Sequence, residues 1–169
     1  MSPRVFVPLT LFCIAGSAAD GGAYFAFSNF VMQGLHRLPV DAAVTAMQQL
    51  DITAENPWFA LALFGTGLAS LVLTSQVIRK QRSRAAMSRA PMLTAVVLYL
   101  LSLVVTFACN VPLNNTLANA DAHAANAAQT WASFYNVWML WNHTRTIIAL
   151  ASTVFFAIAL ARYEQGEAA

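Results

Sequence analysis

Four apolar stretches occupy most of this 169-residue chain, at about residues 5–35, 57–79, 91–109 and 143–162. A helix rises about 1.5 Å per residue, so roughly 20 apolar residues cross a hydrocarbon core of about 30 Å. Lipid offers no partner for an unpaired backbone group, so spans of this kind are helical. Only 9% of the residues are charged, against about 25% in a soluble domain. The sequence therefore predicts one all-α membrane domain, residues 1–169, built as an antiparallel bundle of four transmembrane helices with short outer helices in the loops after spans one and three.

The N-terminal segment permits a second interpretation. Arg4, the apolar run after it and the sequence Gly16-Ser17-Ala18 together resemble a secretory signal with its cleavage site. The apolar pattern resumes beyond this point and continues to Leu35. A signal would be followed by a mature domain, so this continuation favours a first membrane helix.

Basic residues are concentrated between the second and third spans, and they are Arg79, Lys80, Arg82, Arg84 and Arg89. Arg4 and Arg162 flank the two ends of the chain. By the positive-inside rule, these segments face the cytoplasm. We therefore expect a multi-pass protein of the inner (cytoplasmic) membrane, with both termini cytoplasmic and the loops at about 36–56 and 110–142 outside. This topology accounts for the basic run, so we do not expect nucleic acid as a partner. The expected partner is the lipid bilayer. A homo-oligomer stays possible.

One helix face before and within span four combines aromatic and polar side chains. The residues spaced at i, i+4, i+7, i+11 and i+14 are Trp131, Tyr135, Trp138, Asn142 and Arg145. This spacing places them on one side of a helix. Trp and Tyr in such a position are typical of an interfacial aromatic belt. The shared face with an Asn and an Arg indicates instead that some of them turn inward, because polar groups in a membrane bundle usually serve a purpose.

A second polar stripe lies on span three and consists of Tyr99, Ser102, Thr106 and Asn110. Asp20 in span one and Arg145 in span four are opposite charges expected inside the bundle, where an unpaired charge costs several kcal/mol. Two interpretations stay open: a contact that stabilises the bundle, or a polar cavity in its outer half. The cavity would be lined by Asp20, Tyr24, Asn110, Asn142, His143 and Arg145.

A metal site is a weaker hypothesis. His36 and His143 both lie near the predicted outer surface, where they could bind one metal ion or a haem iron. The sequence has no HxxxH pair, and Cys13 and Cys109 lie at different depths, so two unbridged thiols are expected. We expect no cofactor, and haem or a divalent metal is the alternative.

Local signals place helix ends in the loops. Asp41 is expected to cap an outer helix at 41–52, and Asn56-Pro57 is expected to start span two. Asp121 is expected to cap the helix that becomes span four. Val111-Pro112 is expected to end span three, because the residue before a proline disfavours helical backbone.

Five motifs occur in order along almost the whole chain: FAFSNFVMQGLHRLP, AMQQLDITAENPWF, FGTG, NVPLNNTLA and WNHTR. Together they resemble the anthrone-oxygenase-like family of small integral membrane proteins, with NVPLN and WNHTR as the most specific pieces. The chain departs from the family pattern at Gln33, where Pro is expected, and at Leu50-Asp51, where Ile-Asn is usual. Both departures concern the first outer loop.

The resemblance implies an oxygen-dependent oxidation of anthrones to anthraquinones, which is associated with some fungal relatives and is thought to need no metal or flavin. Such a site needs a base for the benzylic proton, donors for the phenolate oxygen and aromatic walls. His143 or Asp20 is then expected to be the base, and Arg145 with Asn110 or Asn142 is expected to stabilise the oxyanion. The expected substrate-binding residues are Tyr24, Asn110, Asn114, Tyr135, Trp138 and Asn142.

Three functions are thus in competition. The first is a membrane-embedded oxygenase-like protein acting on a small lipophilic aromatic substrate with O₂. The second is a haem- or metal-binding membrane protein using His36 and His143. The third is a non-catalytic small-molecule-binding or scaffold subunit in the membrane.

Overall fold

The computed structural model describes residues 3–79 and 86–168, and in these ranges it is helical without any strand. Three of the helical segments, η1 to η3, are π turns. In chain order the elements are α1 (Pro3–Ala26), η1 (Phe27–Val31), α2 (Met32–His36), α3 (Val40–Ala54), α4 (Pro57–Ala60), η2 (Leu61–Gly65), α5 (Thr66–Arg79), α6 (Ala86–Val105), η3 (Thr106–Asn110), α7 (Val111–Ala118) and α8 (Ala127–Ala168).

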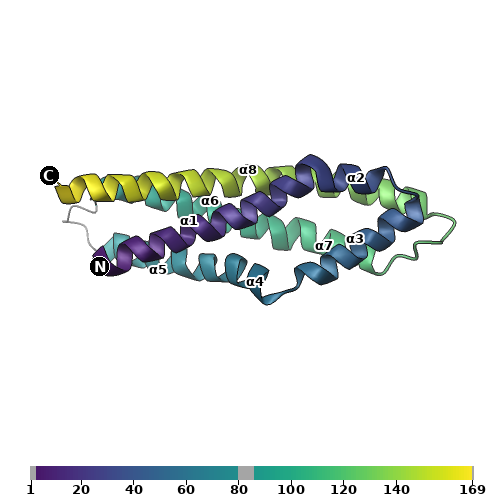
Figure 1. The fold of residues 1–169 in the computed structure, drawn as a ribbon, viewed down its shortest axis with the longest axis horizontal. Helices are drawn as coiled ribbons and strands as arrows, with labels where there is room; N and C mark the ends of the chain where they lie inside the picture. Colours follow the sequence, from purple (N-terminus) through teal and green to yellow (C-terminus); the bar gives the residue numbers. More distant parts are fainter. Residues whose placement is uncertain (1–2, 80–85, 169) are drawn as a thin grey trace.

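Four helical segments are long and apolar enough to cross a membrane, as the sequence predicts: Arg4–His36, Pro57–Gln76, Ser88–Ala118 and Ala127–Gln165. They run along one long axis, with both chain ends at one end of the molecule and α2 and α3 at the other (Figure 1). Helix α8 extends along the full length and packs against α1 and α6, while α5 also packs against both. The protein therefore has the helices of a multi-pass membrane protein, whereas the cytoplasmic placement of its termini stays a prediction. Lys80, Arg82 and Arg84 of the basic run lie outside the described residues.

A π turn interrupts each of the first three spans. The wider i→i+5 turn accommodates one extra residue, which changes the direction of the side chains that follow it, and such turns are frequent at functional sites. The third, η3, comes directly before Pro112, where span three was expected to end. The helix instead continues as α7 to Ala118, because Pro112 falls in the first turn after the change of register, where a missing N–H is tolerated. The outer helix expected after span three is thus an unbroken extension of that span.

The predicted helix caps are correct at one of three positions. The Asn56 side chain accepts hydrogen bonds from the backbone N–H groups of Trp58 and Phe59, at 3.1 and 3.0 Å. Asp41 is not a cap: the extended residue Pro39 precedes α3, and Asp41 lies in its first turn, where its charge favours the helix dipole. Asp121 is also not the cap of α8, since it accepts from the backbone of His123 in a turn that ends before that helix begins at Ala127.

Helix α3 packs against the outer ends of the other helices. Its buried residues Val44 and Met47 join an apolar cluster with Met32, Leu117 and Trp131. The Gln48 side chain also donates to the carbonyl oxygen of Leu117 at 2.9 Å. A second cluster fills the half of the molecule nearer the chain ends, and the unbridged Cys13 is part of it. Helix α3 therefore covers part of the half of the molecule away from the chain ends, which positions the site described below.

Close contact between spans one and two yields a first prediction. A Cβ atom added at Gly16 would overlap the hydroxyl of the fully buried Thr66 and would lie 3.4 Å from the carbonyl oxygen of Ala62. Gly16→Ala is therefore expected to lower the free energy of unfolding by about 1–3 kcal/mol, as overpacking does. Gly22→Ala is the matched control, because an added Cβ at Gly22 meets nothing within 4 Å. Thermal unfolding in detergent measures both, and equal transition temperatures for the two variants would contradict the packing argument.

Candidate functional site

The two predicted stripes face the interior. On α8, Trp131, Trp138, Asn142 and Arg145 are buried and Tyr135 is half-buried, which confirms the one-face prediction. All four residues of the span-three stripe are buried as well. The stripes touch directly, because Arg145 Nη1 lies 3.4 Å from Thr106 Oγ1 and Asn110 donates to the carbonyl oxygen of Trp138 at 3.3 Å.

The Arg145 guanidinium is held in a fixed orientation inside the bundle. Its Nε donates to Asn142 Oδ1 at 2.9 Å. Asn142 is itself fixed, because its Nδ2 donates to the carbonyl oxygen of Tyr24 and to Ser28 Oγ, both at 2.8 Å. The guanidinium carbon lies 4.1 Å from the centroid of the Tyr24 ring and 5.4 Å from that of Trp138. Both distances suit a cation–π interaction, so the charge is stabilised by aromatic faces and side-chain amides.

Asp20 forms no salt bridge with Arg145 within the described ranges, so the direct contact that was one of the two open interpretations is not made. Its Oδ2 instead accepts a hydrogen bond from Tyr99 at 2.6 Å, and Tyr99 Oη also lies 2.9 Å from the carbonyl oxygen of Leu63 in η2. Asp20 Oδ1 is buried without a partner. The carboxyl group thus belongs to a deeper polar contact between spans one, two and three.

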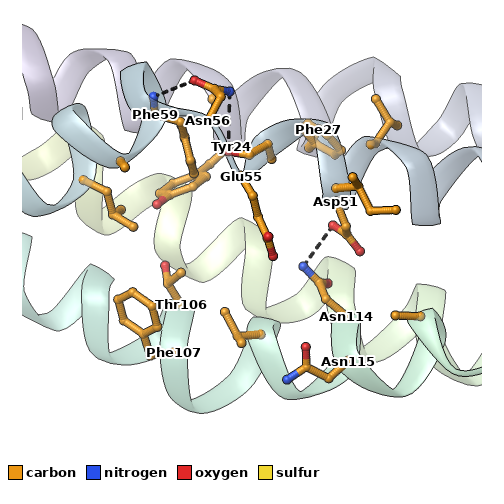
Figure 2. A pocket seen from close by; sticks show the side chains of 18 of the residues that line it. Tyr24, Phe27, Asp51, Glu55, Asn56, Phe59, Thr106, Phe107, Asn114 and Asn115 are labelled. Atoms are coloured by element: carbon orange, nitrogen blue, oxygen red, sulfur yellow. Dashed lines mark hydrogen bonds between the residues drawn. The ribbon is translucent and has the colours of Figure 1, made fainter.

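A chain of hydrogen bonds connects α8 to the outer helix α3. Trp138 Nε1 donates to Asn114 Oδ1 at 2.7 Å, and Asn114 Nδ2 donates to Asp51 Oδ1 at 3.0 Å. The second bond joins side chains from facing helices in Figure 2. The other oxygen, Asp51 Oδ2, is buried and has no hydrogen-bond partner. One oxygen of Asp51 is therefore held by Asn114, and the other makes no hydrogen bond.

Arg145 and Asp51 line one cavity of about 940 Å³. Figure 2 shows Tyr24 and Glu55 directed from one side of this space toward Thr106 and Phe107 on the other. The apolar part of its lining includes Phe27, Phe59, Leu63, Phe64, Phe107 and Trp138, and the polar part includes Gln48, Gln49, Asp51, Glu55, Asn114 and Asn115. A mostly apolar space with a few converging polar groups is the usual form of a small-molecule site.

Burial changes the acidity of Asp51. Loss of water around the carboxyl group raises its pKa from 3.8 to about 6, and the nearby Glu55 charge also raises it, while the positive charge of Arg145 acts in the opposite direction. The carboxyl group therefore changes its protonation state close to neutral pH, the range in which a general base works best.

The expected site residues are only partly brought together. Tyr24, Asn114, Trp138 and Arg145 line the cavity. Asn142 and Asn110 are fully buried behind it and act through hydrogen bonds to Arg145 and to the backbone of Trp138. His143 is exposed and does not line the cavity, because one residue turns a helix by about 100° and its neighbour Asn142 faces inward. The structure therefore does not place His143 in this cavity.

In this structure His36 and His143 lie too far apart to bind the same metal ion. His36 stacks on Tyr135 with ring centroids 4.3 Å apart, and its Nδ1 accepts from Trp131 Nε1 at 3.2 Å. Tyr135 precedes His143 on α8 by eight residues, which corresponds to roughly 12 Å along the axis. One metal ion binds two histidines at about 2 Å each, so the pair cannot share one. Tyr135 packs on His36 and is likewise absent from the cavity lining.

Sequence reasoning named Thr106 only as part of the span-three stripe, and it missed Asp51 and Glu55 as lining residues. Gln48 and Asp51 are three residues apart on an amphipathic outer helix, which is the one signal that was available. This spacing indicates a cavity residue only once the structure shows that α3 packs against the membrane spans.

The arrangement defines a class of protein: a small all-helical membrane protein with a buried arginine and a mostly apolar cavity in the half of the molecule away from the chain ends. The chain matches the family described as anthrone oxygenase over residues 56–155. This match covers more than half of the 169 residues, so the chain belongs to that family. The matched part contains Thr106, Asn114, Trp138 and Arg145, whereas Tyr24 and Asp51 lie before it. No curated protein and no solved structure gives a match to the chain.

Proposed function

We propose that this protein is a membrane oxygenase that oxidises a small, lipophilic carbon acid of the anthrone type with O₂. One observation carries the proposal: a buried arginine and an aspartate with one unpartnered carboxylate oxygen belong to the lining of the same mostly apolar cavity. Family membership is consistent with this chemistry. The catalytic groups we assign are Asp51 as the base and Arg145 as the group that stabilises the oxyanion, in place of His143 and Asp20.

The first step is a proton transfer. Asp51 Oδ2 removes a benzylic proton, and the electron pair of the broken C–H bond delocalises onto the substrate's carbonyl oxygen. Arg145 stabilises the negative charge that develops on this oxygen, since a fixed donor in a water-poor site is effective there. Trp138 supplies a flat face for the aromatic rings.

The second stage forms the new C–O bond. The electron-rich anion transfers one electron to O₂, and the resulting carbon radical and superoxide combine to a peroxide anion. Asp51 returns its proton to this anion, which gives the hydroperoxide. Removal of the second benzylic proton by Asp51 then breaks the O–O bond and forms the ketone. The departing hydroxide takes that proton as water, so anthrone and O₂ give anthraquinone and H₂O.

The test is oxygen consumption by the purified protein in detergent with anthrone as substrate. We expect one O₂ consumed and one anthraquinone formed per anthrone, at a rate above that of a heat-denatured sample. The scheme requires no resident cofactor, and a visible spectrum with elemental analysis tests that part separately. Binding of anthraquinone without any turnover of anthrone would instead assign the chain to the class of non-catalytic binding subunits.

The acidity of Asp51 predicts the pH dependence of this activity. A pKa raised to about 6 means that the carboxylate form needed for proton removal is lost as the pH falls below that value. After subtraction of the uncatalysed reaction, kcat/KM is expected to decrease about tenfold per pH unit below pH 6 and to be level above pH 7. A profile that already reaches its plateau at pH 4.5 would contradict the assignment of Asp51 as the base.

A further inference from the structure

Two phenylalanines of the cavity wall also form part of the outer surface. Phe64 and Phe107 line the cavity, yet their side chains are 58% and 44% exposed. Their rings stack on each other, with centroids 5.7 Å apart and an interplanar angle of 23°. The two rings therefore border both the cavity and the outward-facing apolar surface of spans two and three.

The backbone around this pair explains why the two rings lie at the edge of the cavity. Phe64 belongs to η2 and Phe107 to η3, so both project from π turns. Spans two and three pack together on the side of the chain ends, where α5 meets α6, and α3 meets α7 on the outer side. The two aromatic rings stack on each other from the π turns of spans two and three. Side chains exchange rotamers far more readily than packed helices separate.

The cavity has a second, polar side. Gln49, Glu55 and Asn115 also line it and are exposed, and they lie on or beside the outer helices α3 and α7. A lipophilic molecule that partitions into the bilayer arrives at the apolar side, whereas water and protons exchange at the polar side.

We propose that Phe64 and Phe107 form a lateral opening through which a membrane-dissolved aromatic molecule passes directly from the bilayer into the cavity. The identity of that molecule as an anthrone-type compound rests on the function proposed above. The opening itself rests on the exposure, the stacking and the position of the two rings. Their flat faces match the shape of a polycyclic aromatic, which can replace the ring-on-ring contact while it passes.

Reversible cross-linking of the two positions tests the proposal. The full chain carries Phe64→Cys and Phe107→Cys in a background of Cys13→Ala and Cys109→Ser, reconstituted in lipid vesicles. A short bifunctional methanethiosulfonate reagent closes the opening, and a reducing agent releases it. Two controls carry Phe30→Cys alone in the same background, one treated with the bifunctional and one with a monofunctional reagent, because Phe30 is 61% exposed and does not line the cavity.

The measured quantity is the rate at which anthraquinone added to the membrane quenches the fluorescence of Trp138, which lines the cavity, in a background where the other three tryptophans are replaced by Phe because Trp58 is 81% exposed. Cross-linking is expected to slow this association at least tenfold, with full recovery after reduction and no such change in either control. Association at the same rate in the cross-linked and reduced protein would overturn the lateral opening. This readout does not require turnover, so a protein that binds anthraquinone through the opening but consumes no O₂ would refute the oxygenase function alone.

Discussion

Replacement of Asp51 by Asn is expected to lower kcat/KM for anthrone oxidation by about 10²- to 10⁴-fold, the usual effect of losing a general base. The amide has nearly the same shape as the carboxylate and can still accept the hydrogen bond that Asn114 donates to Oδ1. It cannot take up the benzylic proton. The measurement is initial O₂ consumption over a range of anthrone concentrations, corrected for autoxidation, and the variant should also lose the decrease in activity below pH 6.

Two control variants make this result specific. Asp41→Asn removes a carboxylate from the exposed first turn of the same helix, so its activity should stay within twofold of the parent protein. His143→Ala should also retain activity, because the imidazole is exposed outside the cavity. An inactive His143→Ala protein beside an active Asp51→Asn protein would restore the histidine as the base.

Arg145→Gln is the second substitution with a large expected effect, a decrease in kcat of about 10²- to 10³-fold, as is typical when a preorganised oxyanion donor is removed. The parent guanidinium combines a permanent charge with donors fixed by Asn142 and a planar face between Tyr24 and Trp138. Arg145→Lys should recover only part of the loss, because an ammonium group keeps the charge but has neither the planar shape nor the fork of donors.

The control for the Arg145 variants is Arg162→Gln, which removes an exposed arginine from the same helix. Its activity should match that of the parent protein. Thermal unfolding and anthraquinone binding are measured on every variant, because Arg145 also stabilises buried groups. A folded Arg145→Gln protein with parental kcat would rule out its role in the reaction.

Helical periodicity accounts for most of what could be predicted from the sequence. A period of 3.6 residues places Trp138, Asn142 and Arg145 on one face, and the four spans follow from apolar length alone. The same rule already separates His143 from that face by about 100°. His143 was assigned to the cavity because of its chemistry and its neighbours in the sequence. The structure agrees instead with the helical period, which turns His143 away from the face of Asn142.

The π turns and the position of α3 could not be predicted in this way. A π turn adds one residue to a helix without a distinct composition, so the apolar pattern of span three does not reveal that it passes Pro112. Asp51 is close to Arg145 in space but belongs to a helix outside the membrane segments. Its role depends on the packing of Met47 and Val44 against α2, α7 and α8, which is a long-range property.

The three π turns also have a consequence for how this architecture changes over evolutionary time. Each corresponds to a single inserted residue, and its loss would restore a regular helix and rotate everything beyond it by about 100°. A one-residue deletion within Thr106–Asn110 would thus turn Asn114 away from Asp51 while leaving the span long enough for the membrane. A related sequence that lacks one residue in any of these three segments would therefore keep the fold but lose the cavity or change its lining.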